Sequence, residues 1–282
     1  MVLESLINPF KAKNSVYELF FMGVLFSSAA VFLSNWIFRE QASLIMVFFT
    51  VLATVPFIYN TIKLEERKDL ILNSEIKILK EHFHTINLFL FLFLGFVASF
   101  SFWYVVLPST LVQSTFHVQS ITIQSINIKI LGSFSNMTTF NNILLNNLKV
   151  LVFCVLFAFL YGVGAIFILT WNASVLSTAI GNFIRTNLAF YAEKAGFGIM
   201  ASYLQIVSLG LLRYLLHGIP EILAYFVAGL AGSIISVAVI REKFGTKEFE
   251  KVILDASDLI LIATLILVIA AFIEVFITPT LF

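Results

Sequence analysis

Long apolar stretches separated by short charged segments recur along this chain, and they limit its fold more than any other feature. A stretch of roughly 20 apolar residues, wound as a helix, crosses the ~30 Å hydrocarbon core of a bilayer. Because no water is available there, each backbone group must find its partner within the helix. Of the 282 residues, 60% are hydrophobic and only 12% are charged, whereas soluble domains carry about 25% charged residues. The sequence therefore predicts an all-α, polytopic bundle of transmembrane helices.

The apolar runs between charges predict seven spans. They are residues 17–38, 42–62, 86–107, 148–170, 199–217, 219–240 and 257–278. The stretch 171–198 is too long for a turn and too polar for a span, so we expect an interfacial or re-entrant helix pair on the cytoplasmic side.

Two segments outside the spans carry helical patterns. Leu3, Leu6, Ile7 and Phe10 recur at helical spacing and predict a short helix on the membrane surface rather than a cleaved signal peptide. Residues 63–85 mix both charge signs with apolar positions, which predicts an amphipathic cytoplasmic helix extending the second or third span.

The segment 108–147 is the only sizeable outer loop, and it is rich in Ser, Thr, Asn and Gln. Isoleucines alternate with polar residues around a one-residue slip at Gln124 and Ser125, which predicts a small bulged strand or hairpin. They are Ile121, Ile123, Ile126, Ile128 and Ile130. Asn136-Met137-Thr138 is a glycosylation sequon, a short motif that also arises by chance.

The distribution of Lys and Arg predicts a cytoplasmic N-terminus and an outer C-terminus. With these spans the inner segments hold thirteen basic residues, Arg185 and Lys194 among them, and the outer segments hold four. Cytoplasmic loops of membrane proteins carry such an excess. We therefore expect a multi-pass protein of the cell membrane in contact with its lipids.

Ionisable side chains within a bilayer cost roughly 2.5–3.5 kcal/mol each on insertion scales, so each is a candidate functional residue. The ionisable candidates and the asparagines that flank the fourth span are Arg213, His217, Glu221, Glu274, Asn146, Asn147 and Asn172. Glu274 lies near the outer end of the last span, where we expect it to pair with Arg213.

The stretch "LLHGIPEIL" places His217 and Glu221 four residues apart. On one continuous helix they would share a face and could bind an ion or carry a proton. The intervening Gly218 and Pro220 favour a different interpretation, because Gly suits the position after a helix and Pro the first turn of the next. His in a last turn and Glu in a first turn complement the helix dipoles. We therefore expect a tight turn between two spans.

Several classes of function find no support in the residues. The formal charge of +1 gives no reason to expect nucleic-acid binding, and the lone Cys154 permits neither a disulfide within the chain nor a Cys-based metal site. No catalytic motif or cofactor fingerprint is present. Pairs of glycines, Gly162 with Gly164 and Gly229 with Gly232, favour close helix packing, either within the chain or in a homodimer.

Three stretches of the C-terminal two-thirds resemble the stage II sporulation protein M family, which archaea also carry. "NNLKVLVFCVLFAFLYGVGAIFILTWN" is similar to one span of the family, although Ala173 stands where the family usually has Gly. "LLHGIPEILAYFVAGLAG" resembles its His-Gly-x-x-Glu motif, and "IEVFITP" its closing motif.

The resemblance implies two regions. Residues 1–85 would hold the surface helix, a two-span hairpin and the cytoplasmic linker, and residues 86–282 a five-span family core. It also implies a non-enzymatic membrane scaffold that organises unidentified protein partners in remodelling the cell envelope. The alternative is a transporter or lipid-handling protein that uses His217, Glu221 and Glu274 in a cavity. A closed turn at 217–221 would favour the scaffold, and convergence of the three side chains would favour transport.

Overall fold

The computed structural model describes residues 16–69, 75–131, 135–161, 165–192, 199–241 and 245–281. All regular elements within these ranges are helical. They are α3 (Val16–Ile37), η1 (Arg39–Gln41), α4 (Ala42–Asp69), α5 (Glu75–Val106), α6 (Ser109–Thr115), α7 (His117–Leu131), α8 (Asn136–Tyr161), α9 (Ala165–Ala192), α10 (Ile199–Arg241), α11 (Lys247–Phe272), η2 (Ile273–Ile277) and α12 (Thr278–Leu281). The expected surface helix near Leu3 to Phe10 lies outside the described residues.

Seven of these helices are long and apolar enough to cross a membrane, which confirms the predicted class of fold. The spans are Val16–Ile37, Arg39–Thr61, Ile86–Val106, Asn136–Leu160, Ala165–Leu188, Gln205–Ile240 and Phe249–Leu281. The chain is therefore a multi-pass membrane protein. Beyond the second and third spans, α4 continues to Asp69 and α5 begins at Glu75, so the segment 63–85 contributes helix to both.

The expected boundaries of the fourth and fifth spans were wrong. We expected one span at 148–170 and an interfacial or re-entrant helix pair at 171–198. Instead, α8 ends at Tyr161, and α9 is one continuous helix over residues 165–192. Polar residues hid this span because α9 turns them inward: Ser174, Ser177 and Thr178 are buried, and each donates a hydrogen bond to a backbone carbonyl of α9. A helix can span a membrane with such residues when neighbouring helices cover them.

The expected strand or hairpin in the outer loop was also wrong. Residues 117–131 form α7, whose Gln119 is fully buried and donates hydrogen bonds to the Ser43 carbonyl and the Ser174 hydroxyl. An isolated hairpin is marginal on its own, whereas a helix satisfies its backbone internally and here docks a polar side chain between α4 and α9. Contacts with α4 and α9 therefore favour a helix here, although the alternation of apolar and polar residues indicated a strand.

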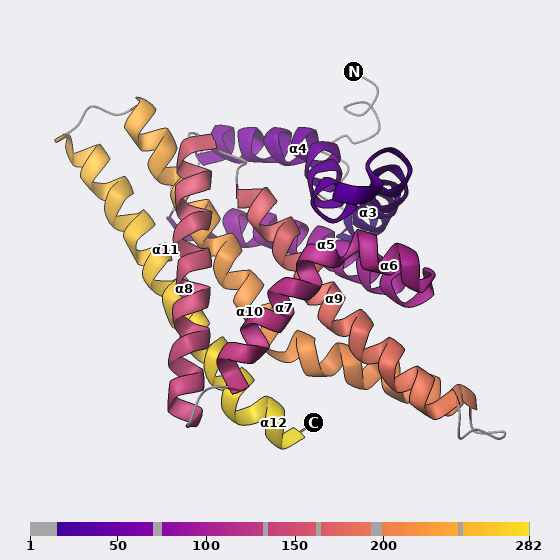
Figure 1. Cartoon of the computed structure of the whole chain (residues 1–282). Helices are drawn as coiled ribbons and strands as arrows, with labels where there is room; N and C mark the ends of the chain where they lie inside the picture. Colours follow the sequence, from indigo (N-terminus) through magenta and orange to yellow (C-terminus); the bar gives the residue numbers. More distant parts are fainter. Residues whose placement is uncertain are drawn as a thin grey trace.

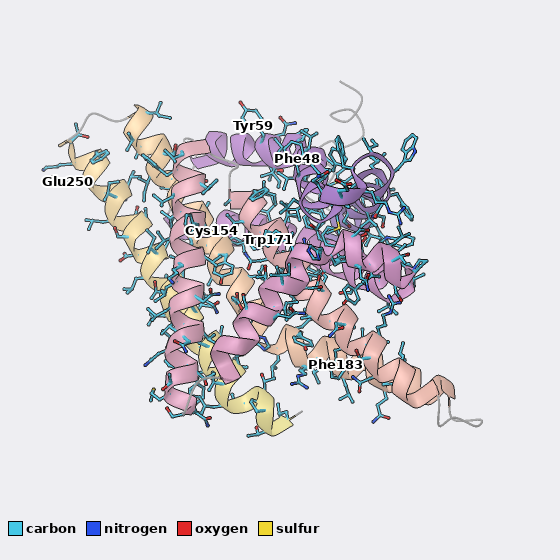
Figure 2. The ribbon with its side chains drawn as sticks, in the orientation of Figure 1. Phe48, Tyr59, Cys154, Trp171, Phe183 and Glu250 are labelled. Carbon is cyan, nitrogen blue, oxygen red and sulfur yellow. The ribbon has the colours of Figure 1, made fainter. Side chains whose placement is uncertain are left out.

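The helices form two groups that share α9 (Figure 1). One group contains α3, α4, α5 and α6, and the other contains α8, α10 and α11. Helix α9 packs against α5 in the first group and against α10 in the second. Side chains project from the helices into the spaces between them (Figure 2), and one large hydrophobic core extends through both groups.

Glycines allow two close helix contacts within the chain. Gly23 of α3 and Gly95 of α5 face each other, and a Cβ on either would overlap a backbone carbonyl oxygen of the opposite helix. Gly232 of α10 similarly meets the Val155 carbonyl of α8, and Gly229 lies against Ala165. Gly229 and Gly232 therefore serve packing within one chain, whereas Gly162 and Gly164 lie outside the described residues.

Candidate functional site: a carboxylate pair inside the bundle

Residues 217–221 lie within a single helix, so the expected turn between two spans was wrong. Helix α10 runs unbroken from Ile199 to Arg241 with Pro220 in its interior. Figure 1 shows that α10 bends near its middle: the half before the bend packs along α9, and the half after it lies beside α8 and α11. Proline has no N–H for the Leu216 carbonyl and its ring crowds that turn, which kinks a helix without ending it. Membrane helices tolerate this because neighbouring helices surround the freed groups.

A second irregularity lies in the last span. Between α11 and α12 the helix widens into a π-helical segment, η2, which contains Glu274. Single π turns inside α-helices are rare and often occur at functional sites. Because η2 packs against both α8 and α10, the π turn of the last span lies against the bent helix.

Glu221 and Glu274 belong to one cluster at these two irregularities. The Tyr225 hydroxyl, one turn after Glu221, donates a 2.7 Å hydrogen bond to its Oε1 atom. The Glu274 carboxyl lies within electrostatic reach of both the Glu221 carboxyl and the Tyr225 hydroxyl. Tyr225 is fully buried and both glutamates are partly buried. Two acidic groups from different spans therefore share one site inside the bundle.

The charge of the carboxyl pair is not balanced by a cationic side chain within the part of the chain that the structure describes. Among the described residues, no Lys, Arg or His contributes electrostatically to either carboxyl. The expected pairing of Glu274 with Arg213 was wrong, because the Arg213 guanidinium lies 5.7 Å from the Phe183 ring centroid and 5.9 Å from that of Tyr214. Arg213 belongs to the half of α10 before the bend, and its guanidinium makes cation–π contacts there.

His217 is one turn before Glu221 but does not join the carboxyl pair. Its Nδ1 atom is buried without a hydrogen-bond partner, and its electrostatic neighbour is Arg213. Gly218, next along α10, packs against the Leu176 side chain of α9 at ordinary contact distance. The structure therefore brings together two of the three ionisable side chains that the transport alternative requires.

The candidate asparagines differ in their surroundings. Asn136 and Asn146 are exposed, and Asn172 donates a hydrogen bond to the Ile168 carbonyl one turn earlier in α9. Asn147 is buried, at 5% exposure, and its amide Nδ2 atom has no hydrogen-bond partner. Of the four, only Asn147 presents an unused polar group to the interior of the bundle.

Sequence reasoning missed two members of the site. Tyr225 lies in an apolar stretch, and its spacing of four from Glu221 was the available signal. Cys154, interpreted as a small core residue, is buried in the second half of α8 (Figure 2), within electrostatic reach of the Tyr225 hydroxyl. Among the described residues, no group of three or more His, Cys, Asp and Glu side chains could hold a metal ion. The site is thus an acidic pair with polar neighbours.

Bent and widened spans around an acidic pair define a polytopic membrane protein with an ionisable site in its interior. Residues 88–279 match the stage II sporulation protein M family, and the chain belongs to that family. The matched region includes both glutamates and omits α3 and α4. No curated protein and no solved structure matches the chain.

Proposed function

We propose that this protein is a non-enzymatic membrane transporter that binds a cation at the Glu221–Glu274 pair. The cation is either a proton or a metal ion. The observation that carries the proposal is the meeting of two carboxyl groups from different spans at a proline bend and a π turn, with no cationic side chain beside them among the described residues. Two carboxylates in a medium of low dielectric constant repel each other strongly. Binding a cation removes that repulsion.

The helix geometry supports transport in a second way. Transporters commonly place their substrate and ion sites where spanning helices are interrupted near the middle of the bilayer. Pro220 lies near the middle of α10, and the halves on either side of it have different neighbours. A change in charge at Glu221, one residue after the proline, would act directly at the bend.

Flux through reconstituted vesicles tests this proposal. The full-length protein is placed in liposomes that contain a pH-sensitive dye and a Mg²⁺-sensitive dye, and a potassium diffusion potential is applied with and without a Mg²⁺ gradient. We expect dye-reported flux above that of protein-free vesicles, and Glu221→Gln or Glu274→Gln should remove most of it because one charge of the pair is lost.

Asp258→Asn is the matched control, since it neutralises an exposed carboxylate of α11. Its flux should equal that of the wild type. Flux indistinguishable from protein-free vesicles, or unchanged flux in both glutamate variants, would contradict the transport proposal.

A scaffold that organises envelope-remodelling partners is the second candidate, and family membership is the observation that favours it. Crosslinking in native membranes followed by mass spectrometry tests this role. The scaffold proposal requires a protein partner that is recovered reproducibly, and its absence from replicate experiments would count against it.

We propose that the N-terminus is cytoplasmic and the C-terminus lies outside. With the spans of the structure, Lys194 moves to the outer side and Arg185 lies within a span, while the segments outside the spans hold ten Lys and Arg on the inner side and two on the outer side. The bias keeps the direction expected from the sequence.

Labelling of single cysteines tests this orientation. In a Cys154→Ser background, Arg39→Cys should react with a membrane-impermeant maleimide in intact cells, whereas Lys247→Cys should react only after permeabilisation. Both positions are exposed, so the label can reach them from the correct side. The reverse pattern would overturn the assignment.

A further inference from the structure

Asn147 is a buried polar residue of α8. It is 5% exposed, and its Nδ2 atom has no hydrogen-bond partner. An unsatisfied buried polar group costs roughly 1–3 kcal/mol, so a side chain in this state is expected to have a binding partner. The side-chain amide can present either its oxygen or its nitrogen, because the two atoms are assigned only from their surroundings.

Contacts on either side of Asn147 place it on the face of α8 that meets the two glutamate-bearing elements. One turn before it, Ile143 of α8 packs with Ala271 and Val275, the residues that flank Glu274 on α11 and η2. Two turns after it, on the same face of α8, Cys154 lies within electrostatic reach of Tyr225, the hydrogen-bond partner of Glu221. The amide thus lies on the stretch of α8 between the contacts made by the two glutamate-bearing elements.

We propose that Glu221, Glu274 and Asn147 bind a hard divalent cation, Mg²⁺ or Ca²⁺, through oxygen atoms from three helical elements. This inference names the ligand of the same site and so rests on the proposed function. Carboxylate and amide oxygens are the ligands that these ions prefer. Two carboxylates carry a charge of −2, which one divalent ion balances and a monovalent ion does not. The Tyr225 hydroxyl occupies one oxygen of Glu221 and leaves the other free.

Thermal unfolding of the full-length protein in detergent tests the site without any transport measurement. Protein treated with EDTA is titrated with MgCl₂ or CaCl₂, and with NaCl or choline chloride at matched ionic strength. We expect the divalent ions alone to raise the unfolding temperature, because a ligand that binds only the folded state stabilises it. Binding of Mn²⁺, followed by its electron paramagnetic resonance signal, should show one site per chain that excess Mg²⁺ displaces.

Variants separate a built site from binding at surface carboxylates. Glu221→Gln and Glu274→Gln should abolish the stabilisation, and Asn147→Ala should weaken the affinity at least about tenfold, as loss of a supporting group typically does at metal sites. Asn147→Asp should restore binding, whereas Asp258→Asn should behave as the wild type. Elution as a single species on size exclusion confirms that each variant is folded before it is compared.

The outcomes distinguish this inference from the transport proposal. Stabilisation by Na⁺ alone, no ion-specific stabilisation, or equal stabilisation of the Glu221→Gln variant would overturn the divalent site. Glutamate-dependent flux without divalent binding would then leave transport standing with a proton or Na⁺ as its ion. Divalent binding without flux would keep the site and remove the transport proposal.

Discussion

Gly95→Ala is expected to lower the free energy of unfolding by about 3 kcal/mol, at the upper end of the usual cost of overpacking. A Cβ at this position would overlap the Phe20 carbonyl oxygen and lie 3.0 Å from the Gly23 Cα atom. Both are backbone atoms of α3, so no side chain can rotate out of the way. The α3 and α5 helices would have to separate, and the Ser28–Ser99 hydrogen bond of 2.9 Å between them would be strained.

Gly218→Ala is the matched control for this substitution. The nearest atom to a Cβ at Gly218 is the Leu176 Cδ2 atom at 3.5 Å, an ordinary contact. Because alanine is favoured over glycine in a helix by up to about 1 kcal/mol, this variant should be as stable as the wild type or slightly more stable. Equilibrium unfolding in mixed micelles with increasing SDS measures both, and similar midpoints for the two variants would show that the close crossing is not needed.

Arg185→Met is the second substitution with a large expected effect, a loss of about 3 kcal/mol. Pro108 has no N–H, so the Tyr104 carbonyl near the end of α5 lacks its usual donor four residues later. The Arg185 Nη1 atom of α9 donates to that carbonyl at 3.1 Å and to the Leu107 carbonyl at 3.0 Å, and Nη2 donates to the Ser109 hydroxyl at 2.9 Å. Hydrogen bonds to charged groups contribute about 1.5–3 kcal/mol each, and a cation also suits the negative end of a helix.

Arg213→Met tests whether the loss of any arginine would lower the free energy of unfolding by as much as Arg185→Met. Arg213 contacts the Phe183 and Tyr214 rings, an interaction of about 0.5–1 kcal/mol at exposed sites. We therefore expect a loss of no more than about 1 kcal/mol in the same unfolding measurement. Equal losses for the two arginine variants would contradict the role of Arg185 in completing the end of α5.

The class of fold followed from the sequence because the bilayer allows few alternatives. Apolar runs of sufficient length must become helices where no water can satisfy the backbone. The same reasoning failed at α9, where Ser174 and Ser177 lowered the apparent hydropathy of a true span. Hydropathy reports the preference of each residue for lipid over water. The burial of the α9 side chains depends instead on which helices surround α9.

Local chemistry also could not separate a turn from a bend. Gly218 and Pro220 are the residues expected where one helix ends and another begins, and they equally suit a kinked helix. The choice depends on packing on both sides of the bend, with Leu176 against Gly218 and Val155 against Gly232. Those contacts come from α9 and α8, more than 40 residues earlier in the chain.

From the amino-acid sequence alone it follows that this chain crosses a membrane repeatedly, that it resembles one family, and that Glu221 and Glu274 are costly within a bilayer. The folded structure was needed to show that these two carboxyls share one site, that Arg213 pairs with neither, and that the Nδ2 atom of the buried Asn147 has no hydrogen-bond partner. Burial in lipid is a property of a segment and can be read along the chain. The electrostatic environment of a side chain depends on distances between helices, which packing alone sets.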